Sequence, residues 1–430
     1  MPTVLKQKTR PISGWGNYPR LEAEVFEPPD RVGVRAFVFE NERIIARGNG
    51  RSYGDAALAP KVLSTLRLNR VLAFDAENGV LECESGALLS DLLKVIVLAG
   101  WFFRVTPGTS QITVGGAIAS DVHGKNHPTA GCFSNCLISF DLMTASGEIR
   151  TCSRSENADL FWQTCGGMGW TGVVLSAKFS LQKITSTQML QKTVRAKNLE
   201  TLFRAFEENS ASPYAAAWVD CTSLQWRGAA FFGEHFVASK LSETFKFSES
   251  STHGIPFYAP SWLLNPLSIR AYNFLYFNKN RDSERLVGLN EYFYPLDSLQ
   301  NWNRLYGRRG LVQYQFCLPE KNAFDGIRQV LETIRHSSEV PFLTVMKRHG
   351  ERPPEALHSF PIRGYSLALD FPRTSGVFDL VKKLDEVAWG LEGKIYLTKD
   401  ACSAPHMGRV NPASFGEAKF SSLLRERIGR

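Results

Sequence analysis

The sequence is poor in cysteine and has no long uncharged apolar run. Its eight cysteines are spread over 430 residues and form no CxxC pair, which excludes a disulfide scaffold and argues against a zinc site. No run reaches the roughly 18 apolar residues that a membrane-spanning helix needs. The opening MPTVLKQKTRPISGWGNYPR lacks the apolar stretch of a secretory signal. These absences predict reduced thiols, no metal site and a cytoplasmic protein.

The sequence also lacks a polybasic block, an internal repeat and a Walker lysine–serine pair. The net charge is +8, but the basic residues lie among acids and aromatics, so nucleic-acid binding is not indicated. Two short basic stretches, GRRG at Gly307–Gly310 and LLRERIGR at Leu423–Arg430, are compatible with an anionic ligand or an anionic membrane surface. Peripheral association with the inner membrane surface therefore stays open beside the cytoplasmic expectation.

Glycine and aromatic residues are unevenly distributed along the chain. Up to about Leu181, glycine-rich turns alternate with short β-branched runs, which is typical of an α+β domain, and LLSDLLKVIVLAG predicts a helix that ends at Gly100. After Lys183 glycine becomes sparser and aromatic rings more frequent, a shift that predicts a domain boundary. The later runs GLVQYQFCLP and GYSLALDFP predict strands, and AFDGIRQVLETIRHS predicts a helix.

A first glycine-rich loop, ARGNGRSYGD at Ala46–Asp55, follows a short apolar run. It approaches the dinucleotide fingerprint GxGxxG, but Tyr53 occupies the third glycine position and Gly54 comes one place late. Asp75 stands roughly where a ribose-binding acid is expected, yet it belongs to FDAENG, which is a hairpin-turn pattern. Taken alone, the loop fits a phosphate site or an ordinary glycine-rich turn.

Two further glycine-rich loops lie at Thr106–Asn135 and at Cys165–Val174. The longer one carries five glycines, two histidines and a lysine with little to bury, which indicates close approach of the backbone to a ligand. Three such loops without a Walker pair predict a large flat cofactor whose diphosphate is held by backbone N–H groups. FAD fits that description, whereas a nicotinamide Rossmann site does not.

The order of the motifs GNGRSYGD, TPGTSQITVGGAIASDVHGKNH, DLMTASGEI and LFWQTCGGMGWTGVV is similar to the FAD domain of the vanillyl-alcohol-oxidase (PCMH-type) flavoprotein superfamily. The likeness runs from Gly14 to about Ala404, and HGKNH with WNRLYGRRGLVQYQF resembles the branch that oxidises polyprenyl-phosphoryl ribose. The resemblance implies an α+β fold: a two-subdomain PCMH-type FAD-binding domain at 1–183, a substrate-binding domain with an antiparallel sheet covered by helices at 184–393, and a return to the FAD domain at 394–430.

The resemblance also implies, residue by residue, which positions bind FAD. These are Gly48, Asn49, Gly50, Arg51, Ser52, Tyr53, Gly54, Asp55, Thr109, Gly115, Gly116, Ala119, Ser120, His123, Gly124, Gly169 and Val173. Many relatives link the flavin to a histidine in the first loop, where this chain has Arg51, and some add a cysteine link at the place of Ser134. FAD is therefore expected to be bound non-covalently. Cys132 and Cys136, which flank Ser134, are interpreted as structural thiols.

Oxidation of an alcohol by a flavin requires a base or a polarising cation beside the hydroxyl. The resemblance implies that Lys399 reaches the substrate next to the flavin, although the residues alone favour a surface lysine. Whether Lys399 acts as a base or as an orienting cation stays open. His123 and Lys125 lie in a glycine loop with no core to fill, and they are the other catalytic candidates. His127 is interpreted as structural.

Candidate substrate-binding residues lie on the predicted strands of the second domain. Gln313 and Gln315 alternate in phase and so point to one face, where amides can read sugar hydroxyls, whereas Tyr314 points to the core. Lys347 is a candidate for a substrate phosphate, with a solvent-exposed lysine as the alternative.

The set of substrate-binding candidates is completed by Ser366 and Lys399. Ser366 and Ala368 stand where mycobacterial relatives carry an asparagine and a cysteine. The resemblance therefore implies that this side of the pocket lacks the thiol of the mycobacterial relatives. The details of the substrate are not carried over from them.

These features predict an FAD-dependent oxidoreductase that oxidises a secondary CH–OH group of a sugar to a ketone. The favoured substrate is the 2′-hydroxyl of polyprenyl-phosphoryl-β-D-ribose, as the first half of an epimerisation to the arabinose compound in arabinan and cell-wall biosynthesis. Because the chain has no nicotinamide motif, an NAD(P)H-dependent short-chain reductase is expected as the partner for the second half. The alternatives are a soluble alditol or aldonolactone oxidase that uses oxygen, and a flavin-free binding protein with the same fold.

Overall fold

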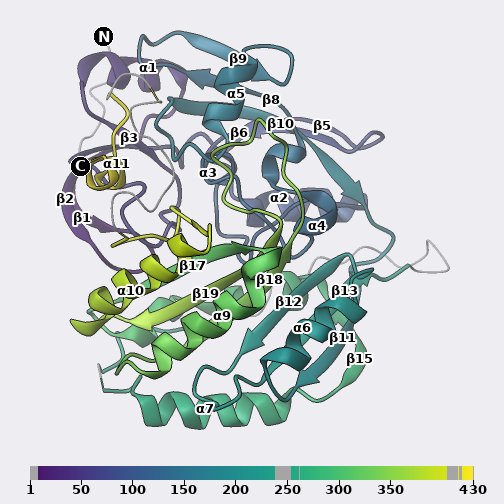
Figure 1. Cartoon of the computed structure of the whole chain (residues 1–430). Coiled ribbons are helices and arrows are strands. Elements are labelled where there is room, and N and C mark those ends of the chain that lie inside the picture. The colour runs from purple at the N-terminus through teal and green to yellow at the C-terminus, as the bar shows by residue number, and fades with distance from the viewer. Residues whose placement is uncertain (1–7, 238–252, 261, 404–414, 416–418, 430) are drawn as a thin grey trace.

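The chain forms four β-sheets within the residues that the computed structural model describes, which are 8–237, 253–260, 262–403, 415 and 419–429. The sheets contain four, six, eight and two strands. The purple and blue N-terminal part holds the first two, and the teal and green part forms the eight-stranded sheet with its helices (Figure 1). This mixture of helices with mainly antiparallel sheets confirms the predicted α+β class.

The four-stranded sheet carries the first glycine loop. Its strands in spatial order are β1 (Lys8–Ser13), β2 (Arg20–Phe26), β4 (Lys61–Ser64) and β3 (Ile45–Arg47). β4 pairs in parallel with β2 and β3, whereas β1 and β2 are antiparallel. Helix α1 (Arg31–Glu40) connects β2 to β3 and begins where the Asp30 carboxylate accepts a hydrogen bond from the amide of Gly33 at 2.9 Å. The loop therefore starts at the carboxyl end of a parallel strand, a common position for ligand sites.

The six-stranded sheet carries the other two glycine loops. Its strands are β5 (Val71–Asp75), β6 (Val80–Glu84), β10 (Val173–Lys183), β8 (Leu137–Met143) and β9 (Ile149–Ser153) in spatial order, with β7 (Trp101–Phe103) also paired to β10. The second loop contains α3 (Val114–Ala119), α4 (His127–Ala130) and the 3-10 turn η2 (Phe133–Asn135), and the third follows α5 (Ala158–Thr164).

Two local predictions for this sheet are confirmed. Asp75 lies in the hairpin between β5 and β6, where its carboxylate accepts hydrogen bonds from the amides of Glu77 and Asn78, each at 3.0 Å. The predicted helix consists of α2 (Leu89–Ile96) and the 3-10 turn η1 (Val97–Ala99), and Gly100 ends it in the left-handed conformation with φ 80°.

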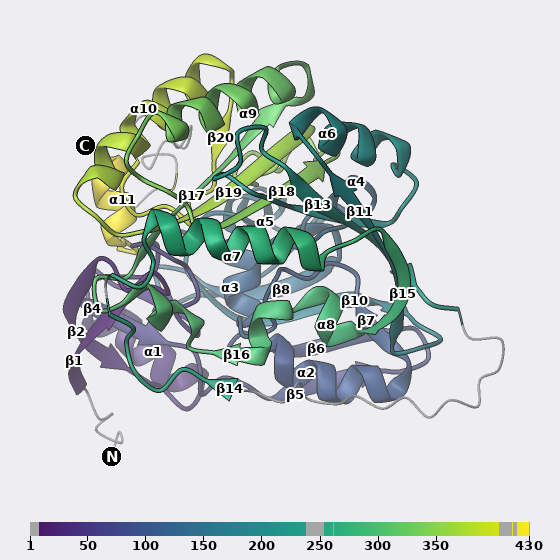
Figure 2. The same cartoon turned by 90° about the horizontal axis from the view of Figure 1, so that it is seen from below.

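The eight-stranded sheet is antiparallel throughout. Its strands in spatial order are β15 (Ser283–Gly288), β11 (Gln188–Ala196), β13 (Gly228–His235), β12 (Tyr214–Val219), β18 (Leu343–His349), β19 (Gly364–Pro372), β17 (Leu311–Pro319) and β20 (Lys394–Ile395). Helices α6 (Leu199–Glu208), α9 (Glu320–Arg335) and α10 (Gly376–Gly390) share one apolar core with it (Figure 2). The antiparallel sheet covered by helices is as predicted.

The remaining elements lie at the other face and at the end of this sheet. They are α7 (Pro266–Lys279), α8 (Leu289–Phe293), the 3-10 turns η3 (Pro295–Ser298) and η4 (Trp302–Tyr306), and the pair β14 (His253–Gly254) with β16 (Leu299–Gln300). On β12, Ala217 and Val219 point into the helix-side core, so Trp218 between them points to the other face of the sheet. There its ring centroid lies 4.8 Å from that of Tyr276 on α7. Helix α7 therefore covers the face opposite α6, α9 and α10. None of the described helices combines the length and apolarity needed to cross a bilayer.

After β20 the chain goes back towards the four-stranded sheet. Helix α11 (Leu423–Ile428) packs Leu424 and Ile428 into the same cluster as Val25 and Leu58. Part of the predicted return segment 394–430, namely 404–414, 416–418 and 430, lies outside the described residues. The domain limits at 183 and 393 remain predictions.

Arg427 of α11 ties three distant segments together. Its guanidinium donates to both carboxylate oxygens of Asp55, at 2.9 and 3.0 Å, and to Asp400 Oδ2 at 2.9 Å. A further bond of 2.7 Å reaches the carbonyl of Ser403. Both aspartates are buried, so this arginine neutralises two carboxylates that have little access to water.

We predict that Arg427→Met destabilises the fold by about 3 kcal/mol or more, because two buried carboxylates would lose their counter-ion. Urea unfolding followed by circular dichroism gives the free energy. The matched control is Arg150→Met, which removes an exposed pair with Glu148 and should cost less than about 1 kcal/mol. Equal costs for the two variants would contradict the assigned role of Arg427.

Candidate active site

A cavity of about 340 Å³ lies between the glycine loops and the face of the eight-stranded sheet that is opposite α6, α9 and α10. This volume is within the range of small-molecule sites. Of the residues predicted from the sequence, those that line it are Gly48, Asn49, Gly50, Arg51, Ser52, Tyr53, Thr109, Gly115, Gly116, Ala119, Ser120, His123, Lys125, Gly169, Gln313, Gln315, Lys347, Ser366 and Lys399. Segments that are far apart in the sequence thus meet at one cavity.

Side-chain hydrogen bonds fix the shape of the first glycine loop. The Arg47 guanidinium donates to the carbonyl of Ser13 at 2.7 Å, and the Asn49 amide donates to the carbonyl of Gln111 in the second loop at 2.8 Å. Gly50 has φ 64°, and a Cβ there would lie 2.2 Å from Arg47 Nη2. Glycine is therefore required at this turn both by its conformation and by the close arginine.

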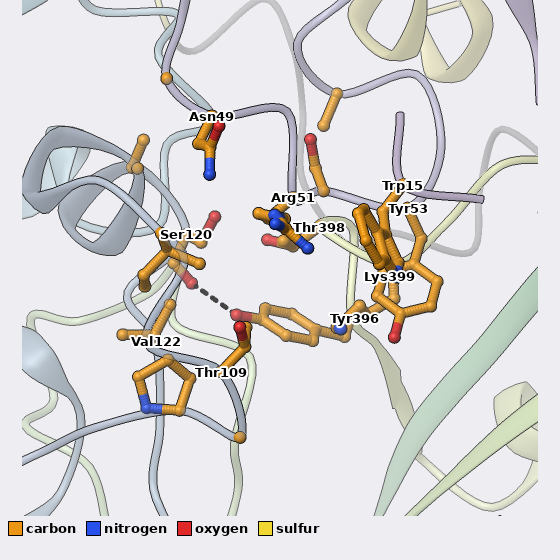
Figure 3. Close-up of a pocket in the computed structure, with 18 of the residues that line it drawn as sticks. Trp15, Asn49, Arg51, Tyr53, Thr109, Ser120, Val122, Tyr396, Thr398 and Lys399 are labelled. Carbon is orange, nitrogen blue, oxygen red and sulfur yellow. Dashed lines mark hydrogen bonds between the residues drawn. The ribbon is translucent and has the colours of Figure 1, made fainter. Parts of the chain in front are cut away.

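Arg51 is held by an aromatic ring beside the cavity. Its guanidinium carbon lies 3.9 Å from the centroid of the Trp15 ring, which is a close cation–π contact. Burial lowers the pKa of Arg51, and Asp297 opposes that shift. Figure 3 shows Trp15, Tyr53 and Lys399 gathered at one side of the cavity, with Ser120 and Val122 at the other.

The second glycine loop presents backbone to the cavity. Thr113 caps α3, with its hydroxyl accepting from the amide of Gly116 at 3.1 Å, and the amide of Gly115 donates to the carbonyl of Ser85 at 2.7 Å. A Cβ at Gly108 would meet no atom within 4 Å, so the loop borders open space. The Ser85 hydroxyl lines the cavity and has no hydrogen-bond partner among the described residues.

Four residues predicted to bind the cofactor do not line the cavity. A Cβ at Gly54 would lie 1.8 Å from the carbonyl oxygen of Asp400, and Asp55 is paired with Arg427. Gly124 packs against the backbone of Thr106, and Val173 lies in an apolar cluster. These four residues support the cavity wall from behind.

The segment from Tyr396 to Asp400 bonds to three parts of the cavity lining. The amide of Tyr53 donates to the carbonyl of Thr398 at 3.0 Å, and the amide of Tyr396 donates to the carbonyl of Gln315 at 2.9 Å. The Tyr396 hydroxyl donates to the carbonyl of Ser120 at 3.2 Å (Figure 3). This segment therefore joins the first loop, the second loop and strand β17.

Lys399 is partly buried and faces the cavity. Its ammonium nitrogen lies 3.7 Å from the centroid of the Tyr53 ring. Burial lowers the pKa of Lys399 to about 7; nearby Asp370 opposes this shift, and Lys347 adds to it. Lys399 can therefore carry or release a proton near neutral pH, which an exposed lysine cannot do.

Two further lysines line the cavity. Burial lowers the pKa of Lys347 to about 8, and burial together with Lys347 lowers the pKa of Lys125 to about 7. The Lys125 ammonium donates to the carbonyl of Tyr292 and lies 4.2 Å from the centroid of that ring. Neither lysine is a solvent-exposed side chain, so the alternative interpretation of Lys347 is wrong.

The two glutamines of β17 both face the cavity, and Tyr314 is buried in the helix-side core, as the alternation predicted. The Gln313 amide donates to the carboxylate of Asp370, whose pKa burial raises to about 6. Gln313 Oε1 and Asp370 Oδ2 are buried and have no partner among the described residues. Gln313 lines the cavity, so its Oε1 atom is an acceptor that a ligand hydroxyl can satisfy, whereas Asp370 is not among the lining residues.

Three buried histidines form a cluster at this wall, in which His123 lines the cavity and His127 and His349 pack behind it. The ring centroids of His123 and His349 are 5.1 Å apart, and those of His127 and His349 are 5.0 Å apart. Burial, with the charge of Lys347, lowers the pKa of all three. His127 accepts a hydrogen bond from the amide of Gly350 at 3.1 Å, in agreement with a structural role.

The polar contacts of the other two histidines reach the cavity lining. Nε2 of His123 lies 3.3 Å from Nε2 of Gln315, and Nε2 of His349 lies 2.7 Å from the Ser366 hydroxyl. No group of His, Cys, Asp or Glu side chains in the described ranges has the arrangement to hold a metal ion.

Thiols do not contribute to the cavity lining in the described part of the chain. Cys132 and Cys136 are buried elsewhere, and burial raises the pKa of Cys136 to about 12. Ser134 donates to the buried carboxylate of Asp121 at 3.0 Å. Ala368 does line the cavity, so a methyl group stands on the side where the resemblance noted a cysteine.

The residues present fit FAD. One end of the cavity is lined by glycine backbone and small polar side chains that can hold a diphosphate, and Ile112, Val122 and Val174 supply apolar surface for a flat ring. The sequence did not single out several lining residues, which are Trp15, Ser85, Thr106, Thr113, Trp302, Tyr396 and Thr398. Thr106 and Thr113 lie in the second glycine loop and Trp302 in the motif WNRLYGRRGLVQYQF, so these three had a sequence signal, whereas the others had none.

Comparison with known proteins gives a match along nearly the whole chain. The chain is 33% identical over 418 residues to the decaprenylphosphoryl-β-D-ribose oxidase of Mycolicibacterium smegmatis, a match covering 93% of this chain and 90% of that protein. Residues 33–153 match the family model described as an FAD binding domain. The match to the L-gulonolactone oxidase of Bos taurus is 30% identical but covers only 36% of this chain and 37% of that protein.

Proposed function

The chain belongs to the decaprenylphosphoryl-β-D-ribose oxidase family of FAD-dependent oxidoreductases, and on this premise we propose that it oxidises the 2′-hydroxyl of a polyprenyl-phosphoryl-β-D-ribose to a ketone. The observation that carries the proposal is that Lys399 and Gln313, whose Oε1 atom has no partner among the described residues, both line the cavity bordered by the glycine loops. The partial match to L-gulonolactone oxidase supports the alternative of a soluble lactone oxidase only weakly.

The glycine loops are proposed to hold FAD. The turn at Gly48–Tyr53 and the backbone around Gly115 and Ser120 would contact its diphosphate and ribityl chain, with Gly169 at the other side. When bound, FAD supplies the acceptor for the hydride that leaves the carbon carrying the hydroxyl. The binding is proposed to be non-covalent, because Arg51 offers no nucleophile and its guanidinium is held against Trp15.

Lys399 is proposed to take the hydroxyl proton. Its lowered pKa, about 7, gives a substantial neutral fraction at physiological pH, and the neutral amine is a base. Gln313 Oε1 would accept a hydrogen bond from a neighbouring sugar hydroxyl and so help to orient the ring, and Asp370 would hold the Gln313 amide in place. The positive charges of Lys347 and Lys125 are suited to a phosphate.

Two partners follow from this proposal. A ketone at C2′ must be reduced from the opposite face to give the arabinose compound, and we propose that an NAD(P)H-dependent short-chain reductase does this. The polyprenyl chain of the proposed substrate is held in a membrane, so we propose that the protein associates peripherally with a bilayer. The sequence has no nicotinamide motif that could supply the second step within the chain.

We predict that anaerobic polyprenyl-phosphoryl ribose bleaches the visible absorbance of the bound flavin, whereas free alditols and gulonolactone do not. The cavity residues suited to phosphate are the reason for this preference. Polyprenyl-phosphoryl arabinose, which differs at C2′ alone, is the matched control and should bleach more slowly. Bleaching by free polyols alone would rule out the proposed substrate.

Replacing Lys399 separates its two proposed roles. Arginine keeps the positive charge but cannot act as a base, and methionine removes both functions. For a base, Lys399→Arg and Lys399→Met both slow flavin bleaching by about 100-fold or more. If Lys399→Arg retains most of the rate, the lysine is an orienting cation instead.

The pH dependence of the bleaching rate is a second test of whether Lys399 acts as a base. The base form of Lys399 is the neutral one, so the bleaching rate of the parent protein should rise with pH up to its pKa of about 7 and then level off. Lys399→Met should lose this rise. A rate that falls as pH increases through the same range would contradict a lysine base.

Denaturation should release all the flavin into solution. The intact mass of the denatured chain should then equal the mass calculated from the sequence, because Arg51 and Ser134 stand where relatives carry linking residues. The variant Arg51→His places a histidine at the position where relatives link the flavin, so it tests whether that residue alone decides the linkage. Flavin that remains with the denatured parent chain would show that the expectation of non-covalent binding is wrong.

A further inference from the structure

Helix α7 exposes apolar side chains on its outer face. Leu267, Phe274 and Leu275 are 79%, 54% and 67% exposed, and their spacing puts them on one stripe of the helix. The opposite stripe is buried and includes Ile269 and Phe277. A surface helix normally has a polar outer face, so α7 is unusual in being apolar on both sides.

The turn that leads into α7 extends this exposed apolar surface. Trp262 and Phe257 are 72% and 69% exposed. The Asn265 side chain donates to the carbonyl of Trp262 at 2.9 Å and accepts from the amides of Leu267 and Ser268, which fixes the turn to the start of the helix. We call Trp262, Leu267, Phe274 and Leu275 the α7 face. In Figure 2, no other described element lies in front of α7.

The charged side chains of α7 and of the segment that leads into it are all basic. The sequence from His253 to Arg281 contains no aspartate or glutamate, and its charged residues are Arg270, Lys279 and Arg281. Arg270 is exposed in the middle of the helix, between Leu267 and Phe274. An apolar stripe with basic residues along it matches the chemistry of an anionic bilayer surface, where rings enter the interface and cations meet phosphates.

Packed aromatic rings connect α7 to the wall of the cavity. The Tyr272 ring of α7 lies 5.1 Å from the Phe342 ring, which lies 5.9 Å from the Tyr306 ring. The next rings are Trp302, 6.2 Å from Tyr306, and Trp15, 5.7 Å from Trp302. Trp302 and Trp15 line the cavity, so a row of packed rings links α7 to the cavity wall.

We propose that the α7 face docks on an anionic lipid bilayer and so holds the cavity next to the membrane. The apolar side chains enter the interface, and Arg270, Lys279 and Arg281 contact lipid phosphates. The consequence for catalysis rests on the proposed function: the prenyl chain of the substrate stays in the bilayer while the phosphoryl ribose reaches the cavity along the aromatic wall. The surface chemistry itself requires no assumption about the reaction.

Vesicle co-sedimentation of the full-length flavoprotein tests the docking. The parent protein should sediment with vesicles rich in phosphatidylglycerol, and less with phosphatidylcholine alone or at high salt. The double variant Phe274→Asp/Leu275→Asp should lower the partitioning by roughly tenfold or more, because it replaces two exposed apolar groups by charges of the lipid's sign.

The matched control is Val32→Asp/Leu98→Asp, which makes the same change at two exposed apolar residues on α1 and η1. It should sediment like the parent. Equal loss in both double variants, or no sedimentation of the parent with any vesicle, overturns the proposal. If the α7 variant instead converts an oligomer to a monomer in gel filtration without a change in sedimentation, the face is a contact between copies and the proposal is wrong.

Flavin bleaching separates this inference from the proposed function. With a short-chain, water-soluble phosphoryl ribose, the α7 variant should bleach at the parent rate, whereas with the long-chain substrate in vesicles it should be slower. If the proposed function fails, neither substrate bleaches either protein, while the vesicle result stands. If only the docking fails, the parent and the α7 variant bleach equally with both substrates.

Discussion

The segment Tyr396–Asp400 is the constraint on which the candidate active site depends. Its backbone and side chains bond to the first glycine loop through Tyr53, to the second loop through Ser120, and to strand β17 through Gln315. The first loop, the second loop and strand β17, which belong to three different sheets, are thereby fixed around one cavity. Asp400 extends this link to Arg427, which also holds Asp55 behind the first loop.

The same segment sets the electrostatics of the site. Lys399 is carried between Thr398 and Asp400, so the bonds that fix the backbone also fix the ammonium group over the Tyr53 ring. Three lysines face the cavity, and burial lowers the pKa of each. Their charged forms are therefore costly when the cavity holds no anion, and a ligand with phosphate groups would stabilise them. An anionic cofactor and an anionic substrate both suit such a cavity.

Local patterns were sufficient to predict part of this arrangement. The strand period puts Gln313 and Gln315 on one face, and the glycine spacing separates the loops from a nicotinamide fingerprint. The order of motifs then indicated the family and its fold. The strand period and the glycine spacing depend on neighbours within a few residues, which is why a single sequence reveals them, whereas the family and its fold came from the resemblance.

Long-range contacts were not predictable in the same way. Asp55 was expected to face a diphosphate, but it meets Arg427, which lies 372 positions later in the chain. Asp370 was not singled out at all, although its contact with Gln313 and its influence on Lys399 make it part of the site. The exposure of Phe274 and Leu275 was equally hidden, since an apolar residue in a helix is normally buried. Each of these facts depends on which segments pair in space.

The central claim is that the hydrogen on C2′ of a lipid-linked ribose leaves in this cavity. Anaerobic reduction of the flavin with substrate deuterated at C2′ tests it most directly, with substrate deuterated at C3′ as the reference. The claim predicts slower bleaching for the C2′-deuterated compound and an unchanged rate for the C3′-deuterated one. Slowing by deuterium at C3′ alone would contradict it, because the bond broken would then be at another carbon.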